Sequence, residues 1–394
     1  MPSVYAIATM DTKGAEVAFV ADCLKRAGID IKMVDVGTKD PPTVRPDIKR
    51  QTVIGTEDLS LGEDRGNAIT AISESLVQFM QAEVAAGRVS GVIGIGGSGG
   101  TAIVTAAMRH LPIGLPKLMV STMASGNVAP YVDCSDITMV YSVVDVAGLN
   151  AVSERVLANA AHAMAGMVVQ PSIDATNKPT VGMTMFGVTT PCVTAVRESL
   201  ESRGLDCLVF HATGSGGRAM EKLVESGLIQ GVLDITTTEI ADEIVGGVLS
   251  AGPTRLDVLI EKRIPLLLSL GALDMVNFGE HDSVPAEFRD RNLYVHNQQV
   301  TLMRTTIEEN VRIATWIANK LNRSTSPLTI LIPENGLSSL DAPGQPFHDP
   351  KANAALFETL SNRLVQTDNR KLVRIPYHIN DPQFATAVVD RFSI

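Results

Sequence analysis

The sequence has few cysteines, few aromatic residues and no run of basic residues, and each scarcity argues against a class of protein. Its 394 residues include four cysteines, with neither CxxC nor Cys/His spacing, so a disulfide framework is not expected. Aromatic residues make up 4% of the chain, so the core must be built from Val, Ile, Leu, Met and Ala, as in layered α/β proteins. The net charge of −10 and the lack of Lys/Arg clusters argue against direct binding of nucleic acid.

The sequence also shows neither an export signal nor a convincing membrane-spanning segment. No basic region precedes an apolar stretch at the N-terminus, and an acidic residue, Asp11, arrives early. Residues 89–108 and 156–173 are uncharged windows of nearly membrane-spanning length, but polar residues and turn signals interrupt both. We therefore expect a cytoplasmic protein that does not contact a membrane.

Two stretches of the chain repeat one pattern. Residues 3–37 and 180–214 align without a gap, and each indicates a strand, a Thr-containing loop, an amphipathic helix, a glycine stop and a second strand. The likeness continues in residues 90–100 and 230–240. This repeated order predicts an α/β protein of two Rossmann-like, doubly wound lobes with mostly parallel sheets.

A polar segment with a proline near each end, QPSIDATNKP at residues 170–179, lies between the repeats and is predicted to be a linker. The N-terminal lobe is therefore placed at residues 1–172 and the C-terminal lobe at residues 178–394. The second lobe is expected to carry three further elements, a long amphipathic helix and two strands, at residues 299–322, 328–334 and 371–379.

The stretch GVIGIGGSGGT, which starts at Gly91, follows a β-branched run and leads into a helix-like one. Backbone N–H groups at the start of a helix carry partial positive charge, and glycines leave them open to an anion, commonly phosphate. No acidic residue follows in the first turns to repel it. We expect this glycine loop to hold the phosphates of a nucleotide in the N-terminal lobe, through Gly96, Gly97, Ser98, Gly99, Gly100 and Thr101.

Two further loops are expected to meet the glycine loop, because ligands of doubly wound sheets bind beyond the carboxyl ends of the strands. In the loop after the first strand, Lys13 would neutralise phosphate, and Asp11 would hold a magnesium ion directly or through water. Asp11 and Thr12 are also suited to capping the first helix. The candidates after the fourth strand are Thr122, Ser125 and Gly126.

Two common nucleotide motifs fit less well. The glycines satisfy GxGxxG, but the next strand, in KLMVSTMASG, ends in Ser and Thr where a nicotinamide dinucleotide would need an acidic residue, so a dehydrogenase is a minor alternative. The Walker A sequence is absent. A second glycine cluster at residues 211–223, with Arg218, predicts either another anion-binding loop or a plain glycine turn.

Longer strings of residues carry a family resemblance. LPIGLPK, SVVDVAGLN, MFGVTTPCV, FHATGSGGRAME, QGVLDITTTE and SLGALDMVNFG together resemble the family of the ATP-binding, virus-inhibitory domain of the tomato mosaic virus resistance protein and its bacterial relatives. The resemblance runs over essentially the whole chain. It implies a two-lobed protein that binds ATP in its N-terminal lobe, self-associates, and has a regulatory or partner-dependent role.

One departure from the plant members concerns the end of the chain. Plant members of this family continue into a barrel-like domain, whereas this chain stops at Ile394 and therefore resembles the bacterial, stand-alone form. A separately encoded barrel protein is then a candidate partner.

An alternative function places chemistry in the C-terminal lobe. A catabolic enzyme for a carboxylated or phosphorylated small molecule would use polar residues at strand ends, there and at the cleft between the lobes, and His211, Glu334 and His378 are the candidates. Each of the three is equally suited to a cap, a turn or a buried hydrogen bond. Asp341 and Asp349, beside Pro-rich turns, are expected to be structural. With no nucleophile elbow or HExxH sequence, the residues leave open whether the chain is an enzyme.

Overall fold

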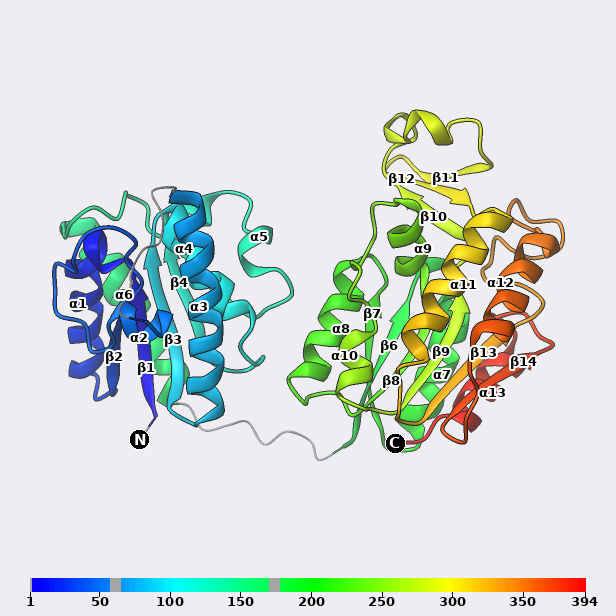
Figure 1. The fold of residues 1–394 in the computed structure, drawn as a ribbon, viewed down its shortest axis with the longest axis horizontal. Coiled ribbons are helices and arrows are strands. Elements are labelled where there is room, and N and C mark those ends of the chain that lie inside the picture. The colour runs from blue at the N-terminus through cyan, green and yellow to red at the C-terminus, as the bar shows by residue number, and fades with distance from the viewer. Residues whose placement is uncertain (1, 57–64, 170–177) are drawn as a thin grey trace. The chain divides into compact units, whose positions relative to one another are not determined.

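The computed structural model describes residues 2–56, 65–169 and 178–394 (Figure 1). In these residues the aliphatic runs of the sequence form strands, and the amphipathic stretches form helices. The chain divides into two compact units, Met1–Asp174 and Ala175–Ile394, which we call the N-terminal lobe and the C-terminal lobe. Most of the segment expected to link the lobes, residues 170–177, lies outside the described residues.

The N-terminal lobe is built on a five-stranded parallel sheet with the order β2-β1-β3-β4-β5. Its strands are β1 (Ser3–Ala8), β2 (Ile31–Asp35), β3 (Val89–Gly96), β4 (Lys117–Ser121) and β5 (Thr138–Tyr141). Its longer helices are α1 (Met10–Arg26), α3 (Arg65–Ala85), α4 (Ser98–Arg109) and α6 (Ala151–Val169), and the shorter ones are α2 (Arg50–Ile54), α5 (Ala129–Val132) and the 3-10 turn η1 (Thr122–Ser125). Helices α1 and α6 cover one face of the sheet and α3 and α4 the other, so the central strands are buried on both sides.

The C-terminal lobe contains a six-stranded parallel sheet with the order β14-β13-β9-β8-β6-β7. Its strands are β6 (Thr180–Met185), β7 (Asp206–His211), β8 (Gly231–Thr236), β9 (Leu266–Gly271), β13 (Leu328–Pro333) and β14 (Arg370–Ile375). Its helices are α7 (Thr190–Ser202), α8 (Ser215–Glu225), α9 (Thr238–Val245), α10 (Asp257–Glu261), α11 (Ile307–Leu321), α12 (Pro350–Arg363) and α13 (Pro382–Arg391), with 3-10 turns η2 (Gly187–Thr189), η3 (His281–Ser283) and η4 (Ala286–Phe288). Helices α7 and α13 cover one face and the others pack on the opposite one.

A small antiparallel sheet extends the C-terminal lobe and corrects one prediction. It consists of β10 (Met275–Phe278), β11 (Leu293–Asn297) and β12 (Val300–Arg304), in the order β10-β12-β11. The first part of the helix predicted over residues 299–322 is therefore wrong, because residues 300–304 form the central strand of this sheet. Helix α11 begins only after Thr306, whose side chain accepts a hydrogen bond from Glu309 N while the Glu309 side chain accepts one from Thr306 N.

The two lobes share strand order and register, which confirms the predicted pair of doubly wound lobes. If the strands of each parallel sheet are numbered along the chain, both sheets have the order second, first, third, fourth, fifth, which in the C-terminal lobe runs from β7 to β13. Strand β14 adds a sixth strand to the C-terminal sheet. Ala6 lies opposite Ile93, and Met183, which aligns with Ala6, lies opposite Leu233. In the second strand of each repeat the ungapped alignment is wrong by one residue. It pairs Asp35 with Ala212, whereas the sheet register makes Asp35 equivalent to His211.

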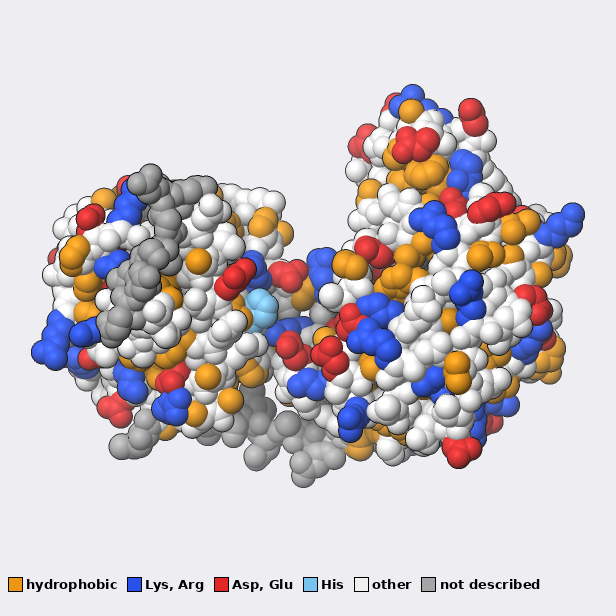
Figure 2. Space-filling view, in the orientation of Figure 1, with side chains coloured by type: hydrophobic (Ala, Val, Ile, Leu, Met, Phe, Trp, Pro, Cys, Tyr) orange, Lys and Arg blue, Asp and Glu red, His pale blue; other side chains and the backbone are white. Residues whose placement is uncertain are grey.

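The surface of the described residues agrees with the charge pattern of the sequence. Figure 2 shows acidic and basic side chains interspersed over the visible face of each lobe, without one broad basic area. No helix in the described part of the chain is long and apolar enough to cross a bilayer. All four cysteines lie in described segments, and none forms a disulfide there.

Candidate functional site

The strand order of the N-terminal lobe creates one position where a ligand is expected. The chain leaves β1 toward one face of the sheet and β3 toward the other, so the connections diverge beyond the carboxyl ends of these two strands. The loop after β1 contains Thr9, and the loop after β3 contains Gly97 and the start of α4. A Cβ added at Gly100 would lie 3.9 Å from Thr9 Oγ1, so the two loops lie side by side.

The glycine loop has three backbone N–H groups without an acceptor. Helix α4 starts at Ser98, and the first helical hydrogen bond runs from Thr101 N to Gly97 O at 2.8 Å. Within the described residues, the N–H groups of Ser98, Gly99 and Gly100 have no protein acceptor. Ser98 is exposed, Gly97 and Gly99 are partly exposed, and Gly100 is buried. The start of α4 is therefore open to an anion from solvent.

The glycines of this loop differ in whether the fold requires them. A Cβ at Gly96 would lie 2.8 Å from the carbonyl carbon of Gly100, so the turn into α4 requires glycine there. At Gly97 an added Cβ would meet only Thr122 Oγ1, at 3.9 Å. The fold itself therefore tolerates a side chain at Gly97, and the loop after β4 reaches this position through Thr122.

The loop after β1 holds Asp11, Thr12 and Lys13, and the structure gives them different surroundings. Asp11 Oδ2 accepts a hydrogen bond from Lys39 N at 3.2 Å, so its carboxylate is turned toward the loop after β2. Thr12 Oγ1 donates to Thr9 O at 3.2 Å in the first turn of α1. Lys13 is partly exposed and has non-helical backbone angles, φ −123° and ψ 20°, which kink the start of the helix.

The hydroxyl groups near α4 divide into buried and accessible ones. Thr101 has no exposed surface, and its Oγ1 lies 2.6 Å from Ser121 Oγ, so this hydroxyl is directed into the fold and not, as expected, toward a ligand. Ser121 Oγ also accepts a hydrogen bond from Met123 N at 2.9 Å and so shapes the turn after β4. Thr122 is partly exposed beside Gly97, and Ser125 and Gly126 are exposed.

Sequence reasoning missed a buried ion pair that supports this edge of the sheet. Asp35, at the end of β2, accepts hydrogen bonds from Met10 N at 3.1 Å and Gly37 N at 2.8 Å, and Arg50 Nε lies 3.2 Å from its other oxygen. Burial raises the pKa of Asp35, and the two N–H groups and the Arg50 charge oppose this effect. An acidic residue after the apolar run of β2 was the signal available in the sequence.

The equivalent position in the C-terminal lobe is closed. Thr236, the last residue of β8, and Thr237 and Thr238 after it have no exposed surface, and Glu239 is 1% exposed. Glu239 Oε1 accepts hydrogen bonds from the N–H groups of Gly214 and Gly217, at 2.7 and 2.9 Å. The second glycine cluster therefore does bind an anion, but the anion is the protein's own carboxylate, and the prediction of a loop open to a ligand is wrong there.

The carboxylate of Glu239 belongs to a buried charge cluster around Arg255. Arg255 is 2% exposed and forms ion pairs with Glu221 at 2.8 Å, Asp234 at 2.8 Å and Glu239 at 3.0 Å. A Cβ at Gly217 would lie 2.0 Å from Glu239 Oε2, so glycine lets the helix start approach the carboxylate. Alignment places Gly99 of the N-terminal lobe where this glutamate stands.

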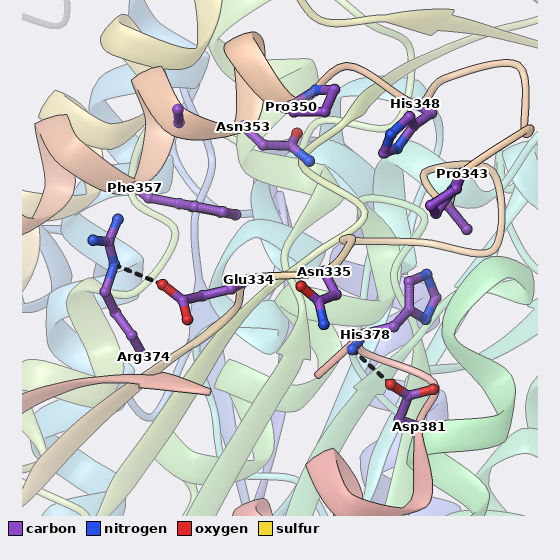
Figure 3. Close-up of a pocket in the computed structure, with 12 residues that line it drawn as sticks. Glu334, Asn335, Pro343, His348, Pro350, Asn353, Phe357, Arg374, His378 and Asp381 are labelled. Atoms are coloured by element: carbon purple, nitrogen blue, oxygen red, sulfur yellow. Dashed lines mark hydrogen bonds and ion pairs between the residues drawn. The ribbon is translucent and has the colours of Figure 1, made fainter. Parts of the chain in front are cut away.

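Two of the three catalytic candidates lie in one cavity of about 720 Å³ in the C-terminal lobe (Figure 3). Glu334 follows β13, and His378 follows β14. His211, at the end of β7, is exposed and packs against Phe186 with 5.3 Å between ring centroids, and it does not line this cavity. Across residues 2–56, 65–169 and 178–394, no cluster of three or more His, Cys, Asp or Glu residues is placed to hold a metal.

The ring of His378 is held by backbone groups. Its Nδ1 accepts a hydrogen bond from Asn380 N at 3.1 Å, so the proton resides on Nε2, which donates to Ser338 O at 2.9 Å. Both ring nitrogens are thus occupied, and this geometry suits a structural residue better than a proton carrier. Asp349 caps α12 by accepting hydrogen bonds from Lys351 N and Ala352 N, which confirms its predicted structural part.

Behind the cavity lie two buried carboxylates, Asp274 and Asp341. Asp274 Oδ2 accepts a hydrogen bond from Ser338 Oγ at 2.7 Å, and its Oδ1 has no partner among the described residues. Burial, together with the charge of Asp341, raises the pKa of Asp274 to about 7. Arg304 acts in the opposite direction.

We expect Asp274→Asn to flatten the pH dependence of stability. A folded pKa of about 7 against an ordinary 3.8 means that the folded state binds more protons between these values, so stability falls as pH rises through this window. The amide does not titrate, so at pH 8 the variant should be roughly 2–4 kcal/mol more stable than the parent, with little difference near pH 4. Urea unfolding at several pH values measures this. Asp282→Asn, at a fully exposed side chain, is the control, and parallel curves for Asp274→Asn and the parent would refute the expectation.

The chain is similar over its full length to proteins of one family. Residues 2–172 match the Uncharacterised protein family (UPF0261) N-terminal domain, and residues 178–393 match its C-terminal domain. A UPF0261 protein of Rhizobium meliloti is 52% identical over 99% of this chain and 98% of its own length. The ToMV resistance protein Tm-1(GCR237) of Solanum lycopersicum is 46% identical over 99% of this chain, which spans 55% of the tomato protein. The sequence resemblance is thereby confirmed, and the chain belongs to the UPF0261 family.

Proposed function

We propose that the N-terminal lobe binds a nucleoside polyphosphate, ATP in the first place, at the glycine loop. The observation that carries the proposal is the contrast between the lobes. In the N-terminal lobe the N–H groups of Ser98, Gly99 and Gly100 have no protein acceptor among the described residues, and Ser98 and Gly99 are accessible to solvent. The aligned part of the C-terminal lobe is buried, and a glutamate fills the neighbouring glycine cluster. Open N–H groups at a helix start bind phosphate. The sequence resemblance supports ATP as the nucleotide.

In this proposal several residues around the loop contact the phosphates of the nucleotide. The N–H groups of Ser98, Gly99 and Gly100 hold phosphate oxygens, and Thr122 adds a hydroxyl beside Gly97. Lys13 supplies a positive charge. Magnesium fits as an ion carried by the phosphates, since it needs few protein carboxylates and keeps several waters, and Asp11 would bind it through water. Thr101 contributes by orienting the loop through Ser121.

The binding test is a titration of the full chain with ATP, ADP and AMP. Because the N–H groups bind phosphate, we expect ATP and ADP to raise the melting temperature more than AMP, and Lys13→Ala to weaken ATP binding about tenfold. Lys25→Ala is the matched control, because Lys25 is an exposed lysine at the other end of α1. A melting temperature unchanged by all three nucleotides would remove the proposal. A regulatory or partner-dependent role, with self-association or a barrel protein as partner, would build on this binding.

A further inference from the structure

The cavity of the C-terminal lobe has the size and two-sided lining of a small-molecule site. Its volume of about 720 Å³ lies within the range of about 300–1,000 Å³ that such sites occupy. Figure 3 shows Glu334 and Asn335 on one side of the opening and Asn353 and His348 on the other, with the ring of Phe357 on the side of Arg374. Prolines and alanines complete the apolar part of the wall.

The charges of this cavity leave no cation for an anionic ligand. Arg374 is the only Lys or Arg in its described lining, and two carboxylates bind it: Glu334 at 3.4 Å and Glu358 at 2.8 Å. Asp381, also in the lining, accepts a hydrogen bond from His378 N at 2.8 Å. With two carboxylates against one paired guanidinium, the cavity disfavours the carboxylated or phosphorylated substrate of the alternative function considered from the sequence.

A buried carboxylate oxygen lies near the ring of His348, which lines the cavity. Asp341 has no exposed surface, and its Oδ2 accepts hydrogen bonds from Leu337 N at 2.9 Å and Asn353 Nδ2 at 2.7 Å. Its Oδ1 has no hydrogen-bond partner and lies 4.0 Å from His348 Nδ1 and 3.9 Å from Arg304 Nη2. The His348 side chain is 33% exposed.

This arrangement offers the His348 ring a partner. A small rotation would bring Nδ1–H onto Asp341 Oδ1 and would satisfy a buried oxygen that otherwise costs free energy. Nδ1 would then carry the proton, and Nε2 of this cavity-lining ring would be left as an acceptor. Such contacts are often long without a ligand and tighten on binding.

We propose that this cavity binds a neutral, polyhydroxylated small molecule of the sugar or polyol type. Hydroxyl groups donate to Glu334 and to Nε2 of His348 and accept from the amide of Asn335, while the ring of Phe357 covers an apolar C–H face. Asp341 is a positioning residue that acts through His348. The site is independent of the nucleotide proposed for the other lobe.

The test uses the full chain and pairs of probes that differ in charge. D-glucose, D-ribose and myo-inositol at up to about 20 mM are compared with D-gluconate and glucose 6-phosphate by thermal shift and calorimetry, which detect millimolar affinity. We expect at least one uncharged probe to bind and its anionic counterpart to bind more weakly. If none of the uncharged probes binds, or if the anions bind more tightly, the proposal is wrong.

Variants then test the residues. His348→Gln should weaken binding of the uncharged probe roughly five- to tenfold, because the ring acceptor is lost. His296→Gln, at an exposed histidine of β11 outside the cavity, is the matched control and should bind as the parent does. Equal affinity of His348→Gln and the parent would overturn the assignment.

The positioning role of Asp341 has its own readout. In histidine-labelled protein, nitrogen NMR of the His348 ring, assigned with His348→Gln, should show the proton on Nδ1 in the parent and a shift toward Nε2 in Asp341→Asn. A merely structural aspartate would leave the ring tautomer unchanged, and that result would remove Asp341 from the proposal.

Discussion

Gly97→Asp is expected to leave the nucleotide-free protein at least as stable as the parent and to abolish its response to ATP. Gly97 is the N-cap residue of α4, and an added Cβ meets only Thr122 Oγ1 at 3.9 Å, so the side chain fits. Asp is a favoured N-cap residue, and its carboxylate would accept hydrogen bonds from the free N–H groups, adding roughly a few tenths of a kcal/mol over glycine. The same carboxylate then occupies and repels the phosphate position, as Glu239 occupies Gly214 and Gly217 in the other lobe. Affinity for ATP should fall by at least about 100-fold.

Two other substitutions of Gly97 separate the effects of side-chain size, of capping the N–H groups and of negative charge. Gly97→Ala adds a methyl group without a charge, and we expect it to bind ATP within a few-fold of the parent. Gly97→Asn caps the same N–H groups without a charge, so an intermediate loss is expected. Calorimetric titration and thermal melting of the four proteins measure both effects. Binding of ATP by Gly97→Asp with parental affinity would mean that the nucleotide, if bound, lies elsewhere.

Arg255→Met is expected to destabilise the C-terminal lobe by more than about 3 kcal/mol, and the variant is at risk of not folding. Arg255 is the cation shared by three buried carboxylates, those of Glu221, Asp234 and Glu239. Its removal leaves uncompensated charge in an apolar interior. It also frees Glu239 from the partner that holds it against the glycine cluster.

The single tryptophan makes this effect measurable in one lobe. Trp316 lies in α11 of the C-terminal lobe, so its fluorescence during urea unfolding reports on that lobe. Arg203→Met, at a half-exposed arginine paired with Asp390 at 3.7 Å, should shift the midpoint little. If Arg255→Met unfolds at nearly the parental urea concentration, the cluster is not a main source of stability in this lobe.

The sequence alone was sufficient for the architecture, because periodicity and strand–helix order are local properties. The alternation of aliphatic runs with amphipathic stretches predicted two doubly wound lobes, and the register of β1 with β3 and of β6 with β8 follows the repeat. The exception over residues 299–322 is instructive. An apolar strand next to an amphipathic helix has a continuous helical pattern in sequence, and only the pairing of β12 with β10 and β11 separates them.

The candidate sites depended more on tertiary contacts, since a side chain's partners come from distant parts of the chain. The sequence determined that two glycine clusters precede helices, the first expected to hold an anion and the second left open between an anion-binding loop and a plain glycine turn. The structure alone decided that Glu239 fills one cluster, across 22 and 25 residues, and that the N–H groups of Ser98, Gly99 and Gly100 stay open. Likewise, Glu334, His348 and Arg374 share a cavity because the ends of β13 and β14 and the start of α12 meet there. Local pattern sets which elements form, whereas burial and long-range hydrogen bonds set which polar groups remain available to a ligand.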